Sequence, residues 1–433
     1  MAALDFPNAP NIGDTWPNPP QTGVPTYRWS GTDWLSAFPL GVERLPIDGS
    51  LAMTGPLTLS GPPTQPLHAT SKDYVDTSAA TGLAAKAVRY DAAQTLTSTQ
   101  KAQARSNIDV LKKNYIINGA MQVSQENGTT AATANGYYPV DQFMAQFSDA
   151  GFRNFHQSAN PTPGGSPYRI RTTVSTADAS VAALDFYRIT HTIEGLRITD
   201  LKSGSATAKT VTLQFGVKAP AGTYCVSFNN AGDTRSYVAE YIIAAGEANT
   251  DVVKSVTLTL DTTGTWATDN TLGIRVSWAL MVGSTFQTAA GAWAAGNFMG
   301  SPNQFNFMGT AGNVFELFDV SLTEGTVAPP FQVPDYASEL ALCQRYFETI
   351  YFGSLNQILH SGVLTGAISY SKWSFKVRKR ATPTSAGGPG VAWVNITPTA
   401  NIGVDEMIFS HGSAWFHLAG TANAVALTAS ARL

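Results

Sequence analysis

Aromatic, amide and imidazole side chains near the end of the chain are the best candidates for ligand binding. Two stretches, 391–396 and 410–418, alternate apolar with polar or aromatic residues, which predicts strands with one buried face. The positions opposite the apolar ones are Trp393, Asn395, His411, Trp415 and His417. Indole rings stack on sugar faces, while amides and imidazoles bond to sugar hydroxyl groups. The pattern indicates either a glycan-binding surface or a contact between subunits, and we expect no metal at the histidines.

A basic cluster at residues 372–380 is the only concentration of positive charge in the sequence. Its members are Lys372, Lys376, Arg378, Lys379 and Arg380. Such cations bind the phosphates of a bacterial surface glycolipid, or they protect the edge of a sheet against pairing with another strand. The protected, solvated edge is the default interpretation.

Residues 290–296 are a run of small residues around one large aromatic side chain, Trp293. This composition predicts a loop. Its indole is expected either to be exposed, where it would bind a glycan, or to insert into a neighbouring subunit.

The residue patterns of common catalytic sites are missing. Residues 204–210 have only a faint likeness to a phosphate-binding loop, because they lack the second glycine before the lysine and lead into a strand. No Gly-x-Ser-x-Gly elbow occurs. Paired carboxylates are defined by their separation in space, but acidic residues are scarce in the β segments. We predict no enzymatic activity, no cofactor and no metal, with a surface-polysaccharide depolymerase as the less favoured alternative.

The composition favours a β-rich chain of several domains. Only 13% of the 433 residues are charged and the net charge is −3, which gives no general attraction to nucleic acid. Two cysteines, Cys225 and Cys343, are too few for a disulfide scaffold. No apolar run is long enough to span a bilayer, and the first ten residues do not have the pattern of a signal peptide. We therefore expect no membrane insertion.

Alternating apolar residues predict strands in the middle of the chain. The clearest stretches are 211–217, 224–228, 256–260, 272–280 and 314–322. Many strands with one apolar face, separated by Gly, Asn and Asp turns, predict a mainly β fold with two sheets packed face to face, and a jelly roll fits best. A Pro-rich run at 328–334 then marks a boundary. A short helix follows it, with Ser338 as the expected N-cap and Cys343 on its buried face.

Residues 51–76 form a unit that is too small to bury a core alone. They combine a strand pattern at 57–60, a Gly-Pro-Pro turn at 61–63 and a capping box that begins at Thr70. Such a unit becomes stable when identical copies pack around an axis. A second, alanine-rich helix is expected to begin at a cap at residue 97 or 98, as an ordered stalk or a flexible linker.

The N-terminal residues are rich in proline and aromatic side chains. Tyr27 and Trp29 share one face of a predicted strand, and residues 30–33 form a turn that leads to Trp34. We expect a small aromatic hairpin that docks on something larger, with a disordered leader as the alternative.

Several of these motifs resemble bacteriophage tail fibre proteins. Met-Thr-Gly at 53–55, Leu-His-Ala-Thr at 67–70 and Lys-Asp-Tyr-Val-Asp at 72–76 look like a fibre shaft repeat. Residues 27–34 are similar to modules near the N-termini of phage tail and fibre proteins. The landmarks that resemble a phage fibre domain with a carbohydrate-binding-module-like jelly roll are 114–119, 138–143, 193–196 and 264–268, followed by 339–346.

The resemblance implies an elongated, homotrimeric virion appendage that is made in the host cytoplasm. It predicts a virion-attachment module at 1–48, a trimeric shaft and helical stalk at 49–113, the jelly roll at 114–335 and a β tip domain at 336–433. The N-terminus would bind other tail, baseplate or collar proteins, and the β domains would bind a host surface glycan. A collar or baseplate fibre without a receptor role is the alternative.

Overall fold

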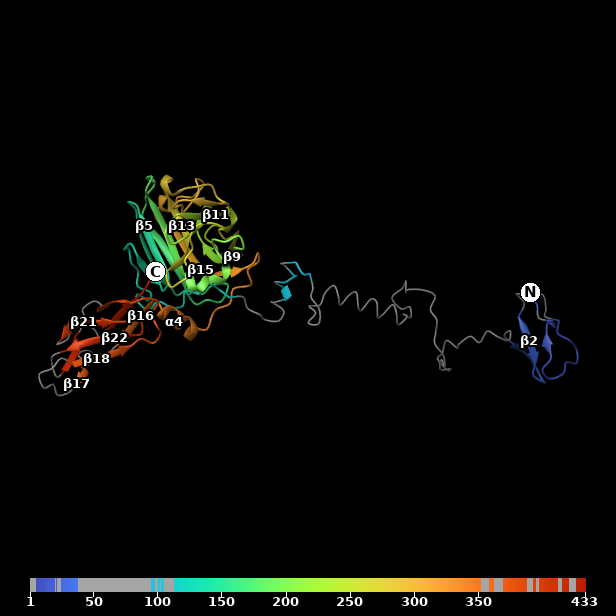
Figure 1. Ribbon diagram of the computed structural model, residues 1–433. Coiled ribbons are helices and arrows are strands. Elements are labelled where there is room, and N and C mark those ends of the chain that lie inside the picture. Colours follow the sequence, from blue (N-terminus) through green and yellow to red (C-terminus); the bar gives the residue numbers. More distant parts are fainter. Residues whose placement is uncertain are drawn as a thin grey trace. The chain divides into compact units, whose positions relative to one another are not determined.

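A computed structural model shows the fold (Figure 1). The structure describes residues 5–19, 21, 25–37, 95–97, 100, 101, 103, 104, 113–351, 358–361, 369–387, 392–394, 397–411, 415–419 and 426–433. The chain divides into two compact units, Met1–Gln94 and Thr95–Leu433. The predicted shaft unit at 51–76 lies outside the described residues.

The first unit contains a three-stranded antiparallel sheet. Its strands are β1 (Thr15–Trp16), β2 (Thr26–Trp29) and β3 (Trp34–Ala37). Ser30 closes the turn between β2 and β3, because its hydroxyl donates to the Asp33 carbonyl (2.8 Å) and accepts from the Asp33 N–H (2.9 Å). Phe6 stacks on Trp34 with 5.2 Å between ring centroids and meets the ring of Tyr27 edge-on. The predicted aromatic hairpin is confirmed, and β1 adds a third strand to it.

A helix begins at Thr97, at the start of the second unit. The N–H of Gln100 donates to the Thr97 hydroxyl (3.2 Å), and the N–H of Thr97 donates to Oε1 of Gln100 (2.9 Å). This reciprocal pair is a capping box. Thr97, one of the two predicted caps, therefore begins the helix, and residues 105–112 lie outside the described part of the chain.

A sandwich of two antiparallel sheets forms the middle of the second unit; β5, β13 and β11 belong to one layer and β9 and β15 to the other (Figure 1). The seven-stranded sheet has the order β14-β11-β10-β13-β8-β5-β4, and the five-stranded sheet has the order β12-β9-β15-β7-β6. The seven strands are β4 (Tyr137–Val140), β5 (Phe143–Ser148), β8 (Phe186–Glu194), β10 (Gly222–Asn229), β11 (Arg235–Ile243), β13 (Leu272–Val282) and β14 (Trp293–Ala295). The five are β6 (Phe152–Ser158), β7 (Arg169–Thr176), β9 (Thr210–Lys218), β12 (Val252–Thr259) and β15 (Val314–Glu324). The predicted sandwich is confirmed, and each of the five predicted stretches contributes a strand.

The two sheets share one apolar core. Phe215 of β9 and Trp278 of β13 are fully buried and meet edge-on, with ring centroids 5.8 Å apart. Side chains alternate along a strand, so Val276 and Trp278 point into the core while Ser277 between them points outward. Burial of each large apolar side chain stabilises the fold by roughly 1.5–3 kcal/mol.

The segment that leads into the sandwich is fixed against β15. The N–H of Tyr115 donates to the Leu322 carbonyl (2.9 Å), and the N–H of Val320 donates to the Gly119 carbonyl (2.9 Å). A Cβ atom at residue 119 would lie 2.0 Å from the Val320 carbonyl oxygen. Only glycine allows this approach of the two backbones.

Helix α4 (Tyr336–Gln344) follows the sandwich. Its N-cap is Asp335, whose carboxylate accepts the N–H of Ser338 (2.9 Å). The prediction of Ser338 as N-cap is wrong, because Ser338 is the residue that donates to the cap and already lies in the first turn. Cys343 is buried in an apolar cluster that includes Tyr346, which confirms its predicted burial.

The described residues after α4 form three antiparallel sheets of three strands each. The strands are β16 (Phe347–Tyr351), β24 (Ala426–Ser430) and β19 (Thr384–Gly387); β17 (Ile358–Ser361), β23 (Trp415–Ala419) and β20 (Ala392–Val394); β18 (Ser369–Ser374), β22 (Glu406–His411) and β21 (Thr397–Ile402). Glu194 of β8 accepts hydrogen bonds from Arg345 (2.5 Å) and from the Tyr346 hydroxyl (2.7 Å). These bonds connect the sandwich to the start of the C-terminal β segment.

Candidate functional site

The predicted residues near the C-terminus fall in two different sheets. Trp415 and His417 lie on β23 and Trp393 on the neighbouring β20, whereas His411 ends β22 in another sheet. The single strand predicted through His411 and Trp415 is therefore wrong, because β22 pairs with β18 and β23 pairs with β17 and β20. Asn395 lies outside the described residues. The roles of all five toward a glycan or a subunit stay predictions.

Two members of the basic cluster interact with other groups of the protein. Lys379 is fully buried, and its ammonium lies 2.5 Å from the carboxylate of Glu348, which is fully buried too. The guanidinium of Arg380 donates to backbone carbonyls, among them those of Ala431 (2.7 Å) and Asn270 (2.8 Å). The Lys379 ammonium is therefore not available to a phosphate.

The remaining members are spread along one stretch of chain. Arg378 is exposed and pairs with the exposed carboxylate of Asp405 at 3.0 Å, an arrangement worth little in stability. Lys376 is exposed, and Lys372 lies on β18. Lys379 therefore does not belong to a surface patch, and the role of Lys372, Lys376, Arg378 and Arg380 as a cationic patch or a protected edge stays a prediction.

Trp293 lies on the edge strand β14 rather than in a loop. Its indole N–H donates to the Thr259 carbonyl (2.9 Å), and its ring meets Trp266 edge-on at 5.3 Å. It also packs against Tyr237. The indole thus connects the edge of the seven-stranded sheet to β12 of the other sheet, and any contact with a glycan or subunit stays a prediction.

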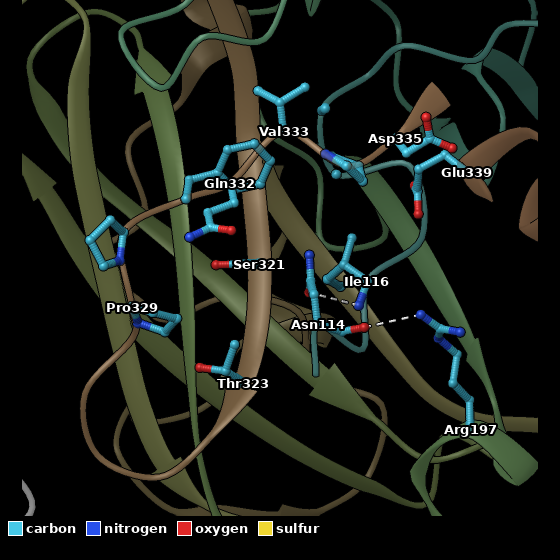
Figure 2. A pocket seen from close by; sticks show the side chains of 15 residues that line it. Asn114, Ile116, Arg197, Ser321, Thr323, Pro329, Gln332, Val333, Asp335 and Glu339 are labelled. Carbon is cyan, nitrogen blue, oxygen red and sulfur yellow. Dashed lines mark hydrogen bonds between the residues drawn. The ribbon is translucent and has the colours of Figure 1, made fainter. Parts of the chain in front are cut away.

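A cavity of about 310 Å³ lies between β15 and the Pro-rich connection to α4 (Figure 2). Ser321 and Thr323 enter it from β15, and Gln332 faces them from the connection. Both hydroxyls are buried without a hydrogen-bond partner in the described part of the chain. On another side, Arg197 donates to the Asn114 carbonyl (3.0 Å). The neutral hydroxyls and amide suit ordered water or a small polar group.

The outer face of the seven-stranded sheet carries a second set of polar side chains. We name the outward positions on four adjacent strands the polar sheet face. They are Gln146 of β5; Arg188 and Thr190 of β8; Arg275 and Ser277 of β13; and Ser227 and Asn229 of β10. The apolar residues that alternate with them point into the core, which fixes the orientation of this face.

Strand register arranges the polar sheet face in rows. Asn229 pairs with Arg275, and in the next row Ser227 pairs with Ser277 and Ser277 with Thr190. In the third row, Arg188 pairs with Ala279 on one side and with Gln146 on the other. The hydroxyl row therefore lies between the row of Arg275 and the row of Arg188.

Many polar atoms on this face have no hydrogen-bond partner among the residues that the structure describes. They are Oε1 of Gln146, Nε and Nη1 of Arg188, Oγ of Ser227, Oδ1 of Asn229 and Oγ of Ser277. A buried polar group left unpaired costs about 1–3 kcal/mol. Such atoms are uncommon in native proteins, and those on this face are enclosed by the protein itself.

Arg188 is the charged residue among these unpaired groups. Its side chain is only 6% exposed, and its guanidinium carbon lies 5.5 Å from the centroid of the Phe186 ring. Burial, followed by the nearby charge of Arg275, lowers the pKa of Arg188 to about 10. Arg188 is therefore still a cation at neutral pH. Arg275, by contrast, pairs with Asp233 at 2.6 Å.

The segment 296–304 covers part of the outer face near β10 and β11. The N–H of Ser301 donates to Sγ of Cys225 (3.3 Å), and Nε2 of Gln304 donates to the Ala279 carbonyl (3.1 Å). Cys225 faces outward, as its place in the alternation predicts. It is nevertheless buried, and burial raises the pKa of its thiol, which makes it an unreactive cysteine.

The polar sheet face was not among the predicted sites. Its signal is present in the sequence, because Arg188 and Thr190, and also Arg275 and Ser277, alternate with apolar residues. That alternation identifies outward positions on each strand. It does not reveal that β8, β13 and β10 are neighbours, which only the sheet topology shows.

The described residues offer neither a metal-binding cluster nor a helix that could span a membrane. Within these residues, no group of three or more His, Cys, Asp and Glu side chains could hold a metal ion. Equally, none of the helices described has the length and apolar character that a bilayer crossing requires.

Comparisons with known proteins give weak likenesses in structure. No protein-family model matches the sequence, and no curated protein matches it. Among solved structures, the chain is similar to the enzymatically active domain of tailspike protein 4 of bacteriophage CBA120, with 12% identity and a TM-score of 0.28 over 49% of this chain and 21% of that one. It is similar to an arabinose-bound α-L-arabinofuranosidase, MgGH51, with 12% identity and a TM-score of 0.28 over 54% of this chain and 30% of the other.

Carbohydrate-binding modules also occur among these similar structures. The family 11 module of a Clostridium thermocellum cellulase is 8% identical, with a TM-score of 0.24 over 47% of this chain and 99% of the module. The chain spans only about a fifth of the tailspike chain.

The prediction that this chain has no enzymatic activity is wrong on this comparison, because an enzymatically active tailspike domain and an arabinofuranosidase are among the similar structures. Absence of catalysis is therefore no longer predicted.

Proposed function

We propose that this protein is a homotrimeric appendage of a bacteriophage virion that binds a glycan of the host cell surface with its β domains. The motifs that resemble fibre shafts and fibre N-termini support the virion part, with attachment to other tail, baseplate or collar proteins through the N-terminus. Trp393, Trp415 and His417, which lie on the paired strands β20 and β23, carry the glycan part, because indole rings stack on sugar faces and imidazoles bond to sugar hydroxyls.

Adsorption of the purified full-length protein to bacteria tests this proposal. We expect labelled protein to bind susceptible cells and to be displaced by purified surface polysaccharide from the same strain. Light scattering at micromolar concentration should give the mass of a trimer. A monomer, or adsorption that the polysaccharide does not displace, would contradict the proposal.

A collar or baseplate fibre without a receptor role is the alternative, and it predicts no adsorption at all. The same polysaccharide, incubated with the protein, is assayed for new reducing ends. Their appearance would assign glycan cleavage to the chain in addition to binding.

The predicted aromatic residues are tested in parallel with the variants Trp415→Ala and Trp393→Ala. Loss of a stacking side chain at a binding hot spot costs about 2 kcal/mol or more. Weaker adsorption at an unchanged melting temperature would support glycan contact. Unchanged adsorption with a less stable trimer would assign these tryptophans to subunit contacts instead.

A further inference from the structure

The small sheet of the N-terminal unit has two unlike faces. On one face, Phe6 packs on aromatic rings from all three strands, Trp34 among them with 5.2 Å between ring centroids. On the other face, strand pairing sets Thr15, Arg28 and Leu35 in one row across β1, β2 and β3. Leu35 is 59% exposed there. The sheet therefore has one face covered by its own chain and one face that leaves an apolar side chain in solvent.

A pocket of about 350 Å³ lies at this open face, where Ile12 and Leu35 line it. These two residues, 80% and 59% exposed, are the large apolar side chains that the described part of the first unit leaves exposed. A single exposed apolar side chain needs no explanation, but two at one pocket indicate a contact surface. The turn that carries Ile12 is held in place, because the N–H of Gly13 donates to the Trp29 carbonyl and the N–H of Trp29 donates to the Asp14 carbonyl, both at 2.8 Å.

The same pocket holds the one cation of the first unit's described residues, Arg28. Asp5, Asp14 and Asp33 belong to the same unit, yet no ion pair or hydrogen bond joins Arg28 to any residue that the structure describes. Its guanidinium lies along Gly13, where Nη2 would be 3.5 Å from a Cβ atom. Arg28 is exposed, so its charge is both uncompensated within the described chain and accessible from outside.

We propose that the pocket lined by Ile12, Arg28 and Leu35 is the surface by which the N-terminal unit binds the virion. Its partner would be a segment of another virion protein that presents an apolar side chain next to a carboxylate. This inference rests on the proposed virion attachment, and it names the surface and the chemistry of the partner. The apolar side chain would be buried against Ile12 and Leu35, and the carboxylate would accept paired N–H donors from Arg28.

A second copy of this chain is the competing occupant. It offers carboxylates of its own, but it lacks a suitable side chain to insert. In the described part of the first unit, the large exposed apolar residues are Ile12 and Leu35, which already line the pocket. A copy would have to insert the residues that form its own pocket. The observations therefore favour a different protein.

The experiment uses the phage that encodes this chain, with its own copy of the gene inactivated and the full-length protein supplied by the host cell from a plasmid. Mass spectrometry of purified virions measures the amount of the protein relative to the major capsid protein. Leu35→Ser removes one apolar wall of the pocket, Arg28→Gln removes the charge, and Arg28→Lys keeps it. Leu196→Ser and Lys202→Gln are the matched controls, since they change an exposed leucine (54%) and an exposed cation of the second unit.

We expect Leu35→Ser and Arg28→Gln each to lower incorporation into virions about tenfold or more, the effect of losing a side chain at a binding hot spot. Arg28→Lys should keep part of the incorporation, because an ammonium retains the charge without the paired donors. Both controls should be incorporated as wild type. Light scattering and limited proteolysis of the free proteins establish that each variant has the wild-type mass and a folded N-terminal unit.

The variant Arg28→Glu adds a test that loss of folding would not pass. Suppressors selected from phage with this substitution should replace a carboxylate of another virion protein by a basic or neutral residue. Suppressors confined to codon 28, or wild-type incorporation of Leu35→Ser and Arg28→Gln, would overturn the inference. A lower oligomer mass for Leu35→Ser would also overturn it, and would assign the pocket to a contact between copies. Absence of the wild-type protein from purified virions would instead count against the proposed virion appendage itself.

Discussion

The two outer faces of the sandwich differ in whether their buried charged side chains have partners. On the five-stranded sheet, Arg169 is 1% exposed and satisfied by two carboxylates, and Asp319 accepts from the hydroxyls of Thr162 (2.9 Å) and Ser166 (2.5 Å). On the seven-stranded sheet, Arg188 is 6% exposed and has no partner among the described residues. A face whose charges are paired stabilises the fold. A face whose charge is unpaired costs stability.

The neutral groups show the same difference less strongly. The unpartnered hydroxyls on the five-stranded face, Ser321 and Thr323, line the cavity beneath the Pro-rich connection. Nδ1 of His156 on β6 is unpartnered among the described residues too, and burial lowers the pKa of this imidazole, so the unsatisfied groups of that face are uncharged at neutral pH.

Single substitutions of Arg169 and Arg188 test this difference between the two faces most directly. Arg169→Met leaves Glu316 buried at 1% exposure, with Arg171 at 3.6 Å as its remaining cation, and should lower the free energy of unfolding by about 3 kcal/mol or more. Arg188→Met removes a charge that has no partner and should leave stability unchanged or raise it by about 1 kcal/mol. Urea unfolding of the full-length protein measures both, and equal losses would refute the distinction between the faces.

A buried acid extends the comparison to negative charge. Asp141 is 1% exposed, and its carboxylate accepts hydrogen bonds from the backbone and side chain of Gln125. Burial raises its pKa from 3.8 to about 6. Between pH 4 and 6 the folded state then holds a proton that the unfolded state has lost, so this residue's contribution to stability falls as the pH rises through that window.

The variant Asp141→Asn removes this titration. Its stability relative to wild type should increase from pH 4 to pH 7 by up to about 3 kcal/mol, the equivalent of the pKa shift. Melting temperatures of both proteins across this range give the difference. A difference that is constant with pH would show that Asp141 is ionised in the folded protein throughout.

Two fully buried serines give the smallest and most closely matched test. Ser166 donates to the carboxylate of Asp319, whereas Ser277 has no partner in the described chain. Ser166→Ala should cost about 2 kcal/mol, because it removes a hydrogen bond to a charged group. Ser277→Ala should be nearly neutral. If both substitutions cost the same, Ser277 has a partner inside the protein and the two faces differ less than we infer.

Sequence by itself determined the local elements of this protein. The turn at Ser30, the cap at Thr97 and the apolar alternation of β9, β10 and β13 depend on neighbouring residues in the chain, so their patterns can be read directly. The same alternation identified one buried and one outward side on each strand. The wrong prediction of the α4 N-cap also concerns neighbouring residues, because Asp335 and Ser338 are both good capping residues and lie three positions apart.

Only the tertiary structure decided which outward residues meet. Arg188 and Ser277 are far apart in sequence, and they share one face because β8 and β13 pair in a particular register. The basic cluster shows the reverse, since neighbours in sequence are separated when Lys379 turns inward to Glu348 and Arg378 remains exposed. Strand order and register are set by the packing of the whole core. A binding surface built across strands is therefore beyond what the spacing of residues along the chain can predict.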